Sequence, residues 1–326
     1  MIDEYEKMDD VEKLRFLAKL SDMYYNMNMT QVEIANKFST TRFKISKFLQ
    51  EARYKNVVEI NINEPREREF DIENELKKQF GLKDAIVLNN KFLQKEEIIY
   101  SIGKLGAEYI DNIISDNSIV GILWGKTIRS IIENLRPQKK LPITAVQVMG
   151  AAAKDNPLVD SQELIRKFAN AYGGKYKYLY APLYIENDYV RKALMHEPVI
   201  NDTLFLANKC DIIITGIGTV DSIFASSLWS NYFIKSRDKY LKESDIIGCT
   251  CGYLYNKDGN YVDIDLNKNL IGIDANILSH VNYIIGVAIG KFKAEAILGA
   301  LKGKHINVLI TDDDTASKVI ALNSTI

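Results

Sequence analysis

Apolar residues recur at helical spacing along the N-terminal part of the chain and predict three helices. The first should cover residues 11–24. Thr30 and Glu33 stand at capping-box spacing, so a second helix should begin there. Polar residues 39–41 interrupt the pattern, and a third helix should run over residues 42–53. The predicted inward faces are Val11, Leu14, Leu17, Ala18, Leu20, Met23 and Tyr24, then Val32, Ile34, Ala35 and Phe38, then Ile45, Phe48, Leu49 and Ala52.

The second and third helices, joined by a tight turn, predict a helix-turn-helix whose last helix fits the DNA major groove. Residues 37–55 carry six basic residues and one acid, which is six minus one or +5, whereas the whole chain carries −1. A solvated hairpin in an ordinary helical domain is the alternative. Cations concentrated on one helix pair favour DNA binding. The predicted DNA-contact residues are Gln31, Thr41, Arg42, Phe43, Lys44, Ser46 and Lys47.

The pattern of apolar and polar residues changes after the third helix. Residues 57–62 alternate between apolar and polar and predict a short strand, or wing, beside the helices. Residues 63–69 are polar and include a proline, which is typical of a linker. We therefore expect a winged helix-turn-helix DNA-binding domain over residues 1–63. An α/β domain for effector binding and oligomerisation should cover residues 64–326.

In that second domain, short apolar runs alternate with amphipathic segments. A helix over residues 67–80 should end at Gly81, a good helix C-terminal residue. Asp258-Gly259 predicts a hairpin turn between residues 253–255 and 260–262. The alternation predicts a mainly parallel sheet covered on both faces. The predicted strands are 85–88, 119–123, 145–148, 212–214, 284–287 and 308–310, with helices through 98–110 and after Thr127.

Four glycine-containing loops follow predicted strands, where open α/β sheets bind ligands. Each loop alone is no more than a tight turn. Four at equivalent strand ends predict one pocket for a small phosphorylated or polyhydroxy ligand. None matches the Walker loop or the dinucleotide fingerprint, so nucleotide binding is not indicated. The loops are Trp124-Gly125-Lys126-Thr127, Met149-Gly150-Ala151-Ala152, Thr215-Gly216-Ile217-Gly218-Thr219 and Gly290-Lys291-Phe292-Lys293.

Composition narrows the class of protein. With 326 residues, 47% of them hydrophobic and 26% charged, the chain should form two soluble globular domains. Its three cysteines lack metal-site spacing and predict free thiols in a reducing cytoplasm. No apolar run reaches membrane-spanning length, and the acidic N-terminus is not a signal peptide. We expect a cytoplasmic protein with no membrane partner, no metal and no cofactor.

Candidate catalytic groups are scarce. The three histidines, His196, His280 and His305, are scattered and should be surface or satisfied core residues. Acidic residues 312–314 follow a predicted strand, where a helix cap accounts for them. The domain therefore resembles a sensor more than an enzyme. Two alternatives stay open: a sugar-phosphate isomerase or deaminase with an accessory DNA-binding head, and a DNA-binding assembly protein without a ligand.

In order and spacing, these motifs resemble the SorC family of sugar-binding transcriptional regulators, including the deoxyribonucleoside and central glycolytic regulators. The resemblance implies a Rossmann-like body related to sugar-phosphate isomerases, usually in a tetramer. It further implies that Gly125, Lys126 and Thr127 hold phosphate and that Lys293 pairs with the ligand. The motifs are residues 30–35, 42–49, 124–127, 145–148, 216–219, 271–273 and 287–293.

Two positions depart from the family pattern. Met149 stands where some members carry a basic residue, which excludes a Schiff base there, and Cys249 stands where an acid commonly holds sugar hydroxyls. We expect a regulator, not an enzyme, whose affinity for a double-stranded DNA operator is controlled by a small phosphorylated sugar, working as a homo-oligomer. The predicted effector-binding residues are Gly125, Lys126, Thr127, Gly150, Ala151, Gly216, Gly218, Cys249 and Lys293.

Overall fold

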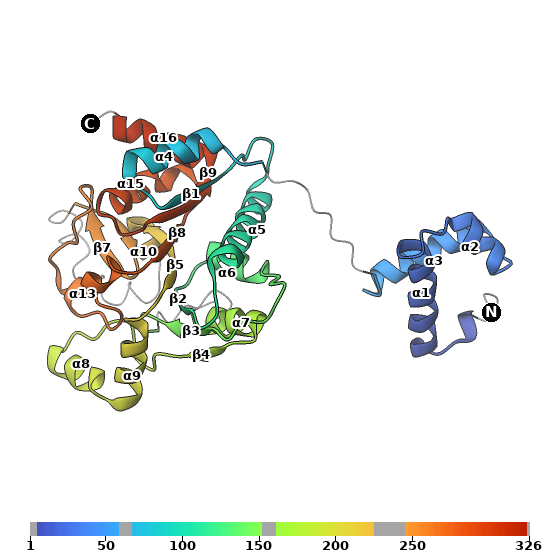
Figure 1. The fold of residues 1–326 in the computed structure, drawn as a ribbon, viewed down its shortest axis with the longest axis horizontal. Helices are drawn as coiled ribbons and strands as arrows, with labels where there is room; N and C mark the ends of the chain where they lie inside the picture. Colours follow the sequence, from blue (N-terminus) through green and yellow to red (C-terminus); the bar gives the residue numbers. More distant parts are fainter. Residues whose placement is uncertain (1–4, 59–66, 152–160, 225–244, 325–326) are drawn as a thin grey trace. The chain divides into compact units, whose positions relative to one another are not determined.

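The computed structural model describes residues 5–58, 67–151, 161–224 and 245–324. The chain divides into two compact units, a head (Met1–Pro65) and a body (Arg66–Ile326), each visible in Figure 1. The division falls two residues beyond the boundary expected from the sequence. Among the described helices, none combines the length and apolar content needed to cross a membrane.

The head contains the three expected helices. Thr30 and Glu33 form the capping box that starts the second helix, and the Thr41 side chain accepts from the backbone N–H of Lys44 at the start of the third. Ser39 in the turn adopts a φ of 49°. The helices are η1 (Tyr5–Lys7), α1 (Asp10–Tyr25), α2 (Gln31–Lys37) and α3 (Arg42–Tyr54).

The buried stripe of the head is narrower than its sequence suggests. Val11, Leu14 and Val32 were expected to face inward, but they are 56%, 41% and 51% exposed. Ala18, also expected to face inward, is exposed too. Three short helices bury only a narrow stripe of each, and Phe16 takes the core position instead. The predicted wing lies almost wholly outside the described residues, although Val57 and Val58 pack against the head core.

A parallel sheet with the order β1-β9-β8-β5-β2-β3-β4 forms the centre of the body, as expected. Figure 1 shows α4, α15 and α16 on one side of these strands and α5, α6 and α7 on the other. The described strands are β1 (Asp84–Leu88), β2 (Ile119–Ile122), β3 (Thr144–Gln147), β4 (Lys175–Lys177), β5 (Ile212–Thr219), β6 (Ile246–Thr250), β7 (Tyr253–Asn256), β8 (Tyr283–Val287) and β9 (Val308–Asp312). The described helices are α4 (Phe70–Phe80), α5 (Lys95–Ile113), α6 (Lys126–Glu133), α7 (Ser161–Tyr172), α8 (Asp188–Met195), α9 (Pro198–Ala207), α10 (Val220–Phe224), α13 (Asp265–Lys268), α14 (Ala275–Leu278), η3 (Lys291–Lys293), α15 (Ala294–Lys302) and α16 (Asp313–Ser324).

Two elements differ from the sequence-based expectation. Helix α4 begins at Phe70 rather than at residue 67, because residues 67–69 exchange backbone hydrogen bonds with the end of β1. Strand β7 pairs mainly with β6, across a turn at Cys251 and Gly252. The hairpin expected at residues 258–259 is reduced to a single bridge between Tyr255 and Tyr261.

His305 is a satisfied core residue, whereas His196 and His280 are exposed. Its Nε2 lies 2.7 Å from the carbonyl oxygen of Gly259, and its ring stacks on Tyr261 at 4.2 Å. Burial lowers the pKa of His305 from 6.5 to about 4.

Folding stability should therefore fall as the pH drops from about 7.5 to 5. The unfolded chain takes up a proton on this histidine in that range while the folded chain does not, which costs about 2 kcal/mol at pH 5. Urea unfolding at several pH values measures the loss. His305→Gln should remove this part of the pH dependence. Parallel curves for the two proteins would contradict the expectation.

Candidate functional site

A cavity of about 280 Å³ opens at the carboxyl ends of β2 and β5 and is closed on one side by the β6–β7 hairpin. Seven of the nine predicted effector-binding residues line it, although they come from four separate segments. They are Gly125, Lys126, Thr127, Gly216, Gly218, Cys249 and Lys293. Three further lining residues, Trp124, Thr215 and Ile217, belong to the predicted loops but were not singled out as binding residues. The lining residues outside the predicted loops and the predicted residue set are Leu123, Ser222, Thr250, Cys251 and Gly252.

The first wall is the start of helix α6. Gly125 precedes the helix with a φ of 141°, a conformation that side chains rarely adopt, so glycine is required there. The first backbone N–H groups of a helix have no partner within it and carry partial positive charge. Lys126 and Thr127 add an ammonium group and a hydroxyl to this wall. The arrangement suits a phosphate group.

Lys293 forms a second wall. Its Nζ donates a hydrogen bond to the backbone carbonyl of Ile217 at 2.9 Å, which holds the side chain across the end of β5. Burial lowers the pKa of Lys293 from its ordinary 10.5. An anion bound in the cavity would stabilise the charged form of Lys293.

The third wall consists of β5 and the β6–β7 hairpin. Residues 215–219, expected to be a loop, continue β5, and the last three of them pair antiparallel with β6. Thr215 and Thr250 place their hydroxyl oxygens 3.3 Å apart, and Thr215 also accepts from the backbone N–H of Cys251. Burial raises the pKa of Cys251 to about 11, so its thiol is neutral near pH 7. This wall offers hydroxyls and thiols instead of carboxylates.

The charges on the described walls are all positive. Lys126 and Lys293 line the cavity, and none of its described lining residues is acidic. Two cations without an acidic partner attract anions and disfavour cations at short range. The charge of the described lining therefore favours an anion over a cation.

The second predicted loop lies outside the described lining. Gly150 donates its backbone N–H to Ile271, and Ala151 exchanges backbone hydrogen bonds with Ala181 and Leu183. A Cβ on Gly150 would lie 2.2 Å from the carbonyl oxygen of Pro182, so the glycine allows close backbone packing. Ala152 lies outside the described residues. The prediction that this loop joins the pocket gains no support from the lining.

Residues 312–314 act as the expected helix cap. The buried carboxylate of Asp312 accepts from the backbone N–H and the hydroxyl of Thr315, at 3.0 and 2.7 Å, and from the backbone N–H of Gly290 at 3.1 Å. Asp314 pairs with Lys291 at 2.8 Å. The three carboxylates lie close enough together to hold a cation, but these internal partners account for the positions of Asp312 and Asp314.

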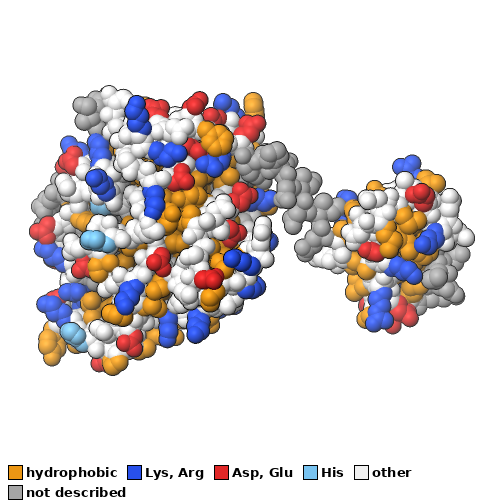
Figure 2. Space-filling view, viewed as in Figure 1, with side chains coloured by type: hydrophobic (Ala, Val, Ile, Leu, Met, Phe, Trp, Pro, Cys, Tyr) orange, Lys and Arg blue, Asp and Glu red, His pale blue; other side chains and the backbone are white. Residues whose placement is uncertain are grey.

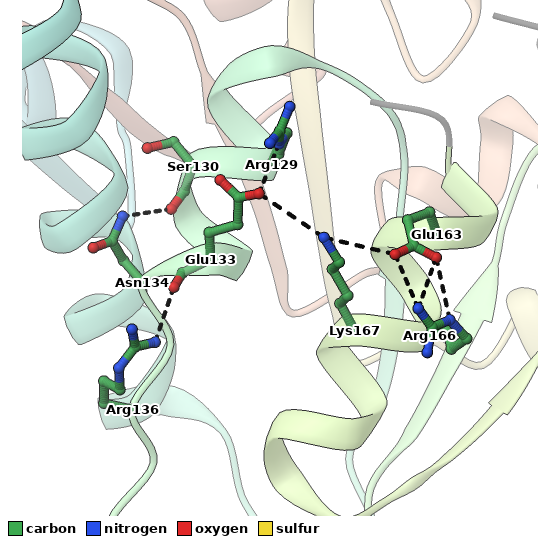
Figure 3. A network of polar contacts seen from close by, with 8 residues as sticks. All are labelled: Arg129, Ser130, Glu133, Asn134, Arg136, Glu163, Arg166 and Lys167. Atoms are coloured by element: carbon green, nitrogen blue, oxygen red, sulfur yellow. Dashed lines mark hydrogen bonds and ion pairs between the residues drawn. The ribbon is translucent and has the colours of Figure 1, made fainter. Parts of the chain in front are cut away.

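A network of ion pairs fixes the outer sides of α6 and α7 against each other (Figure 3). Arg129 contacts Glu133 at 2.7 Å, and Lys167 lies 3.9 Å from Glu133 and 3.6 Å from Glu163. A single exposed ion pair contributes little to stability, but linked ion pairs together restrain the relative orientation of the two helices. The network supports the orientation of the helix whose first turn lines the cavity.

Six of the seven predicted DNA-contact residues cap α3 or lie in its first two turns, and Gln31 begins α2. Thr41, Arg42, Phe43, Lys44 and Lys47 are exposed, and Ser46 and Gln31 are half-buried. Arg42 Nε donates to the side-chain oxygen of Gln31 at 3.4 Å, which links the starts of α2 and α3. On the visible face of the body, in contrast, basic and acidic side chains are interspersed (Figure 2).

Comparison with known proteins covers both units. Residues 64–321 match the family model described as "Putative sugar-binding domain". The chain is 28% identical to the sorbitol operon regulator of Klebsiella pneumoniae over 96% of its own length and 100% of that protein. Identity to the deoxyribonucleoside regulator of Bacillus subtilis is also 28%, over 95% and 99%. The crystal structure of the full-length K. pneumoniae regulator SorC is similar with a TM-score of 0.76 at 27% identity, covering 96% of this chain and 99% of that one.

Proposed function

We propose a function from the premise that this chain belongs to the sugar-binding-domain family and is related over nearly its whole length to SorC-type transcriptional regulators. It is a DNA-binding regulator whose affinity for an operator depends on a small metabolite. The metabolite is a phosphorylated sugar or a close relative, bound in the cavity beside β5. The relatives named above are both described as regulators.

The cavity's charge is the observation that carries this proposal. Its described walls combine a helix N-terminus with Lys126 and Lys293 and no acidic residue, which supports binding of an anion. The hydroxyls of Thr127, Thr215 and Thr250 supply partners for a polyhydroxy compound. Phosphate and sugar recognition therefore fit within one space.

Control of DNA binding requires two arrangements of an oligomer. Two heads that grip a palindromic operator imply at least a dimer, and a tetramer of the same chain would hold two such pairs. The metabolite must bind one arrangement better than the other, because a ligand with equal affinity for both shifts nothing.

A thermal-shift screen of the full chain with pentose and hexose phosphates tests the proposal. At about one hundred times its Kd, a specific ligand adds about 2.7 kcal/mol to the free energy of unfolding and should raise Tm by roughly 5–10 °C. The same sugar without phosphate should give no comparable shift. The stabilising compound should also change the operator affinity of the protein. A panel that leaves both Tm and DNA binding unchanged would contradict the proposal.

A further inference from the structure

Helix α3 presents one outward stripe with an aromatic residue at its start. Phe43, Lys47, Gln50 and Tyr54 follow one another at spacings of four, three and four residues, and all are exposed. Phe43 is 68% exposed although it lies in the first turn of the helix. Ile45, on the opposite side of the helix, is fully buried.

The core of the head packs without the Phe43 ring. Tyr5, Phe16, Phe38 and Phe48 already form a cluster of tilted and edge-to-face contacts at 4.7–5.7 Å between centroids. Phe43 belongs neither to this cluster nor to the apolar residues packed against it. Single exposed hydrophobic residues are common on proteins. The role of Phe43 therefore has to be inferred from the residues around it.

Those surroundings are cationic. The Nζ of Lys47 lies 5.0 Å from the centre of the Phe43 ring, which restrains both side chains. Arg42 is its neighbour on the same turn. The acid of this helix, Glu51, accepts from Tyr5 at 2.9 Å and pairs with Lys55 at 3.0 Å. The partner of this surface must be anionic overall and yet offer an apolar group.

DNA has one such combination in the major groove. Phosphates supply the negative charge, and the 5-methyl group of thymine is the apolar group on the base edges. The first residues of a recognition helix are those that meet the bases. We propose that Phe43 contacts the 5-methyl group of a thymine and selects that base at one position of each operator half-site. This inference rests on the proposed function.

The test compares thymine with uracil, which lacks only the methyl group. The operator is first obtained by selection with the full chain from a random duplex library. Each dT is then replaced in turn by dU. At one position in each half-site, dU should weaken binding of the wild-type protein about fourfold per half-site, the value of one buried methyl group. Phe43→Ala should bind the dT and dU operators equally there, whereas Phe43→Leu should keep part of the preference.

Val11→Ala is the matched control, since it removes an exposed apolar side chain from another helix of the head and should keep the full preference. A melting curve for Phe43→Ala checks that the head stays folded. Equal binding of every dU operator by the wild-type protein would overturn the inference, and so would a preference that survives in Phe43→Ala. A selection that enriches no sequence would contradict the proposed function itself, and the inference with it.

Discussion

Replacing Lys44 and Lys47 with alanine should weaken operator binding about tenfold for each lysine that contacts a phosphate, at about 0.1 M salt. Each such contact releases roughly 0.9 counterion from the DNA, so its loss removes that much from the slope of log affinity against log salt. With two heads on one operator, four contacts would disappear. Fluorescence anisotropy across a salt series measures the affinity and the slope together.

Arg15→Ala/Lys19→Ala supplies the control, because it removes the same charge from exposed positions on α1 of the head. Its slope should stay near that of the wild-type protein. If both double variants lose the same affinity and slope, the effect belongs to the charge of the whole head and not to α3. An unchanged slope in Lys44→Ala/Lys47→Ala would place the DNA elsewhere.

Lys293→Met should abolish the response to the sugar phosphate. The substitution removes a half-buried cation that a bound anionic ligand would cover further. Losing one partner of a buried charge pair costs about 2–5 kcal/mol, or roughly 30-fold to several thousand-fold in affinity. Methionine fills similar space without a charge, so the unliganded protein should melt at or above the wild-type temperature. Isothermal titration measures the affinity, and DNA binding should become insensitive to the ligand.

Lys291→Met is the matched control, since this lysine lies two residues away and pairs with Asp314 on the surface. Exposed pairs of this kind contribute little, so ligand affinity should change less than about threefold. Equal losses in both variants would show that overall charge, and not contact with the ligand, controls binding. Full affinity in Lys293→Met would move the ligand out of the cavity beside β5.

Local chemistry allowed the helix boundaries of the head to be predicted. The capping positions of Thr30 and Thr41 depend only on residues three places ahead, so they can be read from the sequence. Which side of a helix is buried depends on its neighbours in space. Val32 is as apolar as a core residue but lies on the exposed side of α2.

The glycine loops show why the site could be predicted only in part. Gly125 and Gly150 look alike in sequence, each following a strand. At Gly125 the requirement is a positive φ beside open space, and at Gly150 it is the approach of the Pro182 backbone. Sequence reveals that a glycine is there but not which requirement it meets. Cys249 on β6 was predicted, but the turn that joins β6 to β7 was not, because at Cys251 it uses a positive φ that cysteine seldom adopts.

The hydrogen bond from Lys293 to the Ile217 carbonyl has a further consequence. An ammonium group carries three N–H bonds, and this contact occupies one of them. The other two N–H bonds can be donated to a bound metabolite. The hydrogen bond to Ile217 already restrains the rotation of the long side chain. The side chain loses this entropy once, when the polypeptide folds, so ligand binding does not have to restrict it again. A small metabolite can thus be held firmly with few contacts.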